Sequence, residues 1–123
     1  MIAAFAFALV LALLLCFQLA LAFGAPWGHL AWGGQNTGTL PTGYRIGSAV
    51  SVLVYAPMAF VALDRAEVID VLPDGVSSVA MWVIFGILAL GVVMNAISRS
   101  RAERLVMTPV AILLAVLALL TAL

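Results

Sequence analysis

Four long apolar stretches occupy most of the sequence, and they constrain its fold more than any other feature. They cover residues 2–23, 45–63, 77–97 and 105–123. A helix rises 1.5 Å per residue, so about 20 apolar residues cross a hydrocarbon core ~30 Å thick. Inside lipid the backbone must satisfy its own polar groups, and a helix does so within one segment. We therefore predict an all-α, polytopic membrane protein whose four transmembrane helices form one bundle, a single domain over residues 1–123.

The ends of these stretches carry weaker signals. Ser77 or Ser78 has the side chain that an N-terminal cap of the third helix needs. Thr108 and Pro109 suit the start of the fourth helix. A helix counted from Pro109 would span only ~22 Å, however, so we expect the fourth helix to begin near Ala102.

The first stretch has a second interpretation, as a cleaved signal peptide. Ala20-Leu21-Ala22 resembles a cleavage site. The stretch lacks a basic leader, and its apolar run exceeds the 7–15 residues or so that are usual for signal peptides. We favour a helix that is retained.

The composition excludes most soluble functions. Hydrophobic residues make up 67% of the 123 residues and charged residues only 8%, whereas a soluble domain carries roughly 25% charged residues. Five Lys and Arg side chains form no basic stripe for nucleic acid. A lone Cys16 and a lone His29 predict neither a disulfide nor a metal or haem site. We expect no cofactor, no catalytic residue and no enzyme, because no acid, base and nucleophile occur together.

Loop charges predict the orientation in the membrane. Segment 98–104 has a net charge of +2, from Arg99, Arg101 and Arg104 against Glu103. Segment 64–76 has a net charge of −3, from Asp64, Glu67, Asp70 and Asp74 against Arg65. Short Arg-rich loops stay in the cytoplasm. We expect a multi-pass protein of the bacterial inner membrane with both termini outside, and with the three arginines at lipid headgroups or, alternatively, at a docking patch.

The inner loop, residues 24–44, is rich in glycine and aromatic residues. It contains six Gly, two Trp and one Tyr. Amphipathic rings suit the headgroup layer, and glycine permits tight turns. The loop is therefore expected to cap the bundle at the interface or, alternatively, to bind a ligand through the amides of Gln35 and Asn36.

Uncharged polar residues gather near the inner ends of the four stretches. Counted along each helix, five of them lie within about 10 Å of the inner face. Because polar groups in lipid need partners, they are expected to point toward one another as a hydrated cluster. The predicted members are Gln18, Ser48, Ser51, Asn95 and Thr108, with Arg45 at the rim and Gln35 and Asn36 closing it. The alternative is that they form hydrogen bonds that hold helices together.

Small residues predict close helix packing at two positions. Gly47 and Ser51 lie four residues apart, as do Gly91 and Asn95. Such spacing lets two helix backbones approach closely. We expect Gly47 and Gly91 to lie at helix contacts, either inside the bundle or in a homo-oligomer such as a dimer.

Four short motifs lie between residues 24 and 109. They are GAPxGxxAxGG at residues 24–34, LPxxxR at 40–45, SRSxxE at 98–103 and MTP at 107–109. Their order resembles that of an uncharacterised family of small bacterial four-helix integral membrane proteins. The resemblance implies the four-helix layout and brings with it no activity, cofactor or catalytic residue.

Two functions remain after these exclusions. The first is a non-catalytic scaffold or accessory module that binds lipid or a partner through its helices. The second is an oligomeric channel or small-solute transporter with a polar vestibule facing the cytoplasm. A solid apolar outer half of the bundle would favour the first.

Overall fold

The computed structural model describes all of residues 1–123 and contains four long helices and no strand. The helices are α1 (Ile2–Ala22), α2 (Thr42–Arg65), α3 (Asp74–Ala96) and α4 (Arg101–Ala122). Each is long and apolar enough to span a membrane. The predicted all-α fold with four membrane-spanning helices is confirmed.

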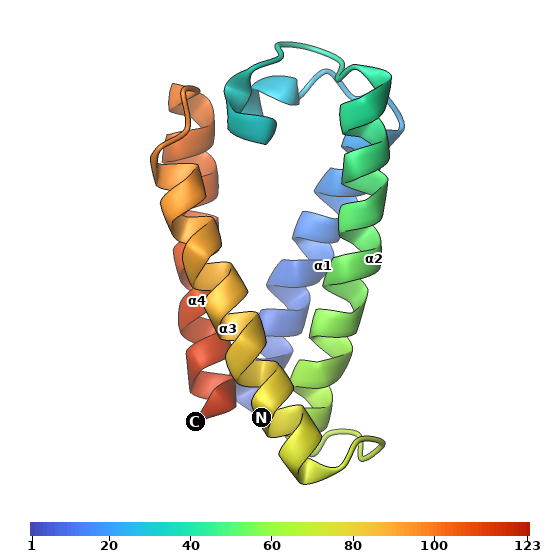
Figure 1. Cartoon of the computed structure of the whole chain (residues 1–123), viewed down its shortest axis with the longest axis vertical. Coiled ribbons are helices and arrows are strands. Elements are labelled where there is room, and N and C mark those ends of the chain that lie inside the picture. The colour runs from blue at the N-terminus through green and yellow to red at the C-terminus, as the bar shows by residue number, and fades with distance from the viewer.

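The four helices form two antiparallel pairs arranged as a V (Figure 1). α1 pairs with α2, and α3 pairs with α4. The pairs meet at the end that holds both termini and the α2–α3 connection. They diverge at the other end, where the α1–α2 loop lies across the opening. This loop contains two short 3₁₀ turns, η1 (Gly28–Leu30) and η2 (Trp32–Gly34).

The apolar core lies where the two pairs converge. Small side chains such as Ala62 and Ala118 are fully buried there, which lets the backbones approach. The core residues are Phe7, Leu11, Met58, Ala62, Met81, Ile84, Leu88, Leu114, Ala115, Ala118 and Ala122. Many large apolar side chains on the outer surface, such as Leu53 and Val79, are exposed, as expected for helices surrounded by lipid. The end of the bundle near the termini is therefore solid.

Two predicted helix starts need correction. α3 begins at Asp74, before either serine that was expected to cap it, and the Ser77 hydroxyl donates to the Asp74 carbonyl instead. The turn at Pro73, which sits at the N-cap, starts the helix earlier than hydropathy indicated. α4 begins at Arg101, close to the expected Ala102. Pro109 therefore lies inside the helix rather than in its first turn, and the carbonyl four residues before it lacks a helical donor.

Candidate functional site

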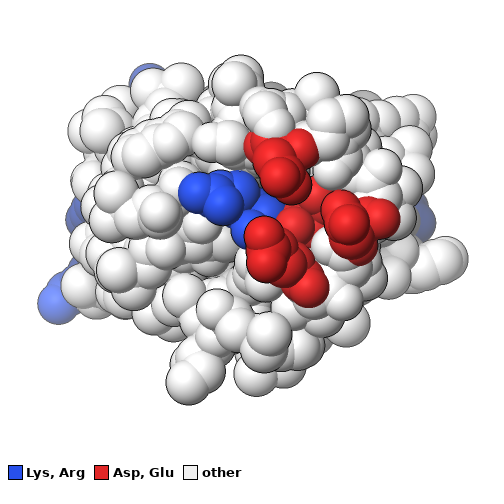
Figure 2. Space-filling model, turned by 90° about the horizontal axis from the view of Figure 1, so that it is seen from below, with Lys and Arg blue, Asp and Glu red and all other residues white.

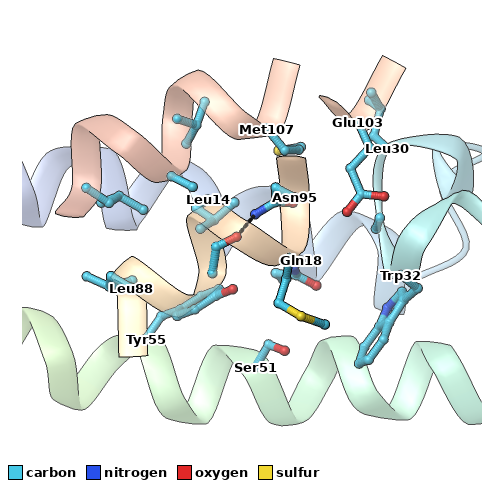
Figure 3. A pocket seen from close by; sticks show the side chains of 16 residues that line it. Leu14, Gln18, Leu30, Trp32, Ser51, Tyr55, Leu88, Asn95, Glu103 and Met107 are labelled. Atoms are coloured by element: carbon cyan, nitrogen blue, oxygen red, sulfur yellow. Dashed lines mark hydrogen bonds between the residues drawn. The ribbon is translucent and has the colours of Figure 1, made fainter. Parts of the chain in front are cut away.

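A cavity of about 350 Å³ lies where the helix pairs diverge. All four helices and the α1–α2 loop line it (Figure 3). Its walls are mostly apolar, with side chains that include Leu14, Leu30, Leu88, Met94, Met107, Val110 and Leu114. Its polar side chains are Gln18, Ser51, Tyr55, Asn95 and Glu103, together with the indole of Trp32. The volume corresponds to roughly a dozen water molecules and falls at the small end of known ligand sites.

Trp32 attaches the loop to α2. Its indole N–H donates to the Ser48 hydroxyl over 3.2 Å, and Ser48 is fully buried. The ring also covers Gly47, where an added Cβ would lie 2.8 Å from it. The Tyr44 ring meets the indole edge-on at 5.5 Å between centroids. Trp32 has a φ of +55°, a conformation that costs a bulky residue energy and that these contacts hold in place.

The other side of the loop rests on the start of α4. The Ser100 hydroxyl donates to the carbonyl of His29. Gly34 packs so tightly that an added Cβ would lie only 2.2 Å from the Ser100 Cβ. The loop therefore connects the two arms of the V and closes the cavity at its open end. This geometry agrees with the prediction that the loop caps the bundle.

The structure brings three residues of the predicted polar cluster to one cavity. Gln18, Ser51 and Asn95 line the cavity, from three different helices. They do not bond to one another, however. The Ser51 hydroxyl donates to the Gly47 carbonyl over 3.0 Å, and the Asn95 amide donates to the Gly91 carbonyl over 2.8 Å. The Gln18 amide oxygen is buried without a hydrogen-bond partner. Hydrogen bonds linking helices, the alternative interpretation, are absent among these three side chains.

Thr108 is a correction to the predicted cluster. Met107, Val110, Ala111 and Leu114 form the face of α4 that lines the cavity. One residue along a helix is a rotation of about 100°, which turns Thr108 away from that face. It lies instead in a shallow groove on the surface of α4, with Leu105, Pro109 and Ile112. The position of a residue along a helix predicts its distance from the membrane face. It does not predict the direction in which the side chain points around the helix axis.

Arg45, Gln35 and Asn36 also lie outside the cavity. Arg45 donates from Nε to the carbonyl of Ala22 at the end of α1, over 3.0 Å. Gln35 is exposed, and its side-chain oxygen accepts from the Tyr44 hydroxyl. Neither residue lines the cavity, and Asn36 does not line it either. The prediction that these three form the rim and floor of the cluster is wrong, because Leu30, Ala31 and Trp32 occupy that place.

The predicted helix contacts at two glycines are wrong within the chain. Gly47 makes its close contact with the Trp32 ring of the loop, not with a helix. Gly91 lines the cavity, and a Cβ added there would meet nothing within 4 Å. Only Gly47 therefore has a neighbour that leaves no room for a side chain.

Glu103 is the residue of the cavity that the sequence analysis missed. It was counted only in the net charge of segment 98–104 and in the SRSxxE motif, yet its side chain is only 6% exposed. One carboxylate oxygen, Oε2, accepts from the Ser98 hydroxyl over 2.8 Å, while the Glu103 N–H donates to the Ser100 hydroxyl over 3.2 Å. The spacing Ser100-x-x-Glu103 before an apolar run is a capping-box signature and could have identified it.

Charges of opposite sign occupy opposite ends of the molecule. Arg99, Arg101 and Arg104 are exposed at the start of α4, at the same end as the cavity and loop. At the far end, acidic side chains surround an arginine (Figure 2). The charged residues of that connection are Asp64, Arg65, Glu67, Asp70 and Asp74. The Arg65 guanidinium donates to the carbonyl of Ala122, which ties this end to the last turn of α4.

The chain matches no protein-family model, no curated protein and no solved structure. The structure also contains no group of three or more His, Cys, Asp or Glu side chains that could hold a metal ion. The cavity, with its roof and its polar lining, is therefore the feature from which a function can be argued.

Proposed function

We propose that this protein is a non-catalytic module of a bacterial inner membrane that binds a small amphipathic molecule, such as part of a lipid, in the cavity between its helix pairs. The single observation that carries the proposal is the composition of the cavity wall. Apolar side chains from α1, α3, α4 and the loop surround a few polar groups. Ligand sites have this character, with a mostly apolar lining and a few polar groups that fix orientation.

The packed core supports a binding module over a channel. Below the cavity, the side chains of Phe7, Leu11, Met81 and Ala118 are almost completely buried. A permeating polar solute would need a continuous polar path past them. One chain supplies every wall, so binding does not require an oligomer.

Filling the cavity tests this function. Gly91→Leu places a side chain in the cavity, because nothing lies within 4 Å of its Cβ position. Gly86→Leu is the matched control, since Gly86 is also open on α3 and does not line the cavity. The probe is hexanol, and its affinity is measured by ligand-observed NMR with the protein in phosphatidylcholine nanodiscs and empty nanodiscs as the blank.

We expect Gly91→Leu to weaken hexanol binding at least tenfold and Gly86→Leu to leave it unchanged. Native mass spectrometry of the detergent-purified protein should show a bound lipid that is lost with Gly91→Leu alone. Equal hexanol affinity for Gly91→Leu and the parent protein would contradict the proposal.

A further inference from the structure

Glu103 gives the cavity its only formal charge. The lining contains no Lys or Arg. The nearest arginine in sequence, Arg104, donates to the carbonyl of Ser98 over 2.6 Å instead. Figure 3 shows the Glu103 carboxylate pointing into the cavity from the side that the loop closes. The first turn of α4 favours this negative charge, because a helix N-terminus carries a partial positive charge.

The hydrogen bonds at the start of α4 involve only one of the two oxygens of this carboxylate. The Ser98 hydroxyl donates to Oε2, and Ser98 accepts in turn from the Ser100 N–H over 3.1 Å. The Ser98 hydroxyl thus lies between the Ser100 N–H and the Glu103 carboxylate and bonds to both. The second oxygen, Oε1, accepts no hydrogen bond from the protein, although the side chain is only 6% exposed. A carboxylate that is almost buried, and whose second oxygen faces a cavity without a protein partner, would be stabilised by a hydrogen-bond donor or a positive charge placed there.

Several other lining groups present acceptors or aromatic rings, beside the donors of the Gln18 amide and the Tyr55 hydroxyl. Asn95 and Ser51 use a donor on the backbone of their own helix, which leaves the oxygen of each side chain as an acceptor. Gln18 adds a buried amide oxygen with no partner. Trp32 and Tyr55 line the same cavity (Figure 3). Aromatic faces attract cations, most strongly where water is excluded.

We infer that the cavity selects amphiphiles with a cationic, hydrogen-donating head, a primary alkylammonium rather than an alcohol or an anion, and that Glu103 is the counter-ion. The inference rests on the proposed function and names the chemical class of its ligand. The ammonium N–H groups donate to Glu103 and to the neighbouring acceptors. The alkyl tail lies against the apolar side chains of α1, α3 and α4. The volume admits a head and a short tail, so the remainder of a longer chain would extend out of the cavity.

Three probes of equal tail length separate the effect of the head-group charge from that of burying the alkyl tail. They are hexylammonium, hexanol and hexanoate, each titrated by ligand-observed NMR into the protein in zwitterionic phosphatidylcholine nanodiscs, with empty nanodiscs subtracted. We expect hexylammonium to bind at least about tenfold more tightly than hexanol, as a charged hydrogen bond of ordinary strength gives. Hexanoate should bind most weakly. This comparison within the parent protein requires no variant to fold.

Two variants assign the selectivity to one carboxylate. Glu103→Gln keeps an oxygen that can accept from Ser98, and it should reduce the preference for hexylammonium over hexanol to about one. Glu67→Gln removes the same charge from an exposed position at the far end and should keep the full preference. Circular dichroism melting confirms that both variants are folded.

The outcomes separate the two proposals. Equal binding of hexylammonium and hexanol by the parent protein would overturn the inference and leave the binding function standing. A preference that survives in folded Glu103→Gln would overturn the role of Glu103. Binding of none of the three probes would overturn the proposed function itself.

Discussion

Two glycines of the α1–α2 loop disfavour a side chain for different physical reasons, and the difference can be measured as stability. Gly34 and Gly38 both have a φ near +70°, at +71° and +73°. A side chain in this left-handed region costs roughly 1–2 kcal/mol. Gly34 also packs against Ser100, while a Cβ at Gly38 would meet nothing within 4 Å. Only Gly34 therefore combines backbone conformation with close packing.

We predict that Gly34→Ala destabilises the protein more than Gly38→Ala does. Gly38→Ala should lower the free energy of unfolding by about 1–2 kcal/mol, the backbone cost alone. Gly34→Ala adds a methyl 2.2 Å from the Ser100 Cβ, so the loop must also move away from α4. The measurement is unfolding by detergent titration, followed by tryptophan fluorescence. Equal losses for the two variants would mean that the contact between the loop and α4 contributes nothing to stability.

At the scale of elements, Asp64 organises the connection between α2 and α3. It lies in the last turn of α2 and is 5% exposed. Its Oδ2 accepts the N–H groups of Val71 and Leu72 over 2.8 and 2.9 Å. One carboxylate thus folds the connection back onto the end of the helix. Without it, these two backbone donors would need other partners.

We predict that Asp64→Ala lowers the free energy of unfolding by about 2–3 kcal/mol, because hydrogen bonds to charged groups contribute about 1.5–3 kcal/mol. Asp64→Asn keeps one acceptor oxygen and should cost less. Asp70→Ala is the matched control, since Asp70 is exposed in the same segment and removes the same charge. Thermal melting in detergent distinguishes the three. A loss for Asp70→Ala as large as that for Asp64→Ala would show that net charge, not the two hydrogen bonds, matters.

The helices were predictable from sequence because lipid thickness sets their length and hydropathy marks them. The angle between the pairs was not, since packing against neighbours decides tilt. The α1–α2 loop keeps the arms apart, and its fold depends on contacts such as that between Trp32 and Ser48, far apart in sequence. Gln18, Ser51 and Asn95 were placed correctly by depth, whereas Thr108 required the direction around α4. The burial of Glu103 was not predicted, because the net charge of its segment was considered and its spacing from Ser100 was not.

At the scale of the whole molecule, the two ends of the bundle differ both in charge and in shape. The cavity, its roof and the three exposed arginines of α4 lie at one end of the bundle. The acidic connection and both termini lie at the other end (Figures 1 and 2). Arg-rich short segments remain on the cytoplasmic side. We therefore expect the proposed binding site to lie at the cytoplasmic end of the bundle.

We predict that both termini and the acidic connection face the outside of the cell. The test uses single cysteines at Asn36, in the loop, and at Asp74, in the acidic connection, in a Cys16→Ser background because Cys16 is itself exposed. A membrane-impermeant maleimide applied to intact cells should label the cysteine at position 74 and spare the one at 36, and permeabilised cells should label both. Arg99, Arg101 and Arg104 replaced together by Gln should weaken this bias, since they supply the positive charge that retains the segment. Labelling at position 36 in intact cells would contradict the predicted orientation. It would show that the end of the bundle with the loop and the cavity faces outside.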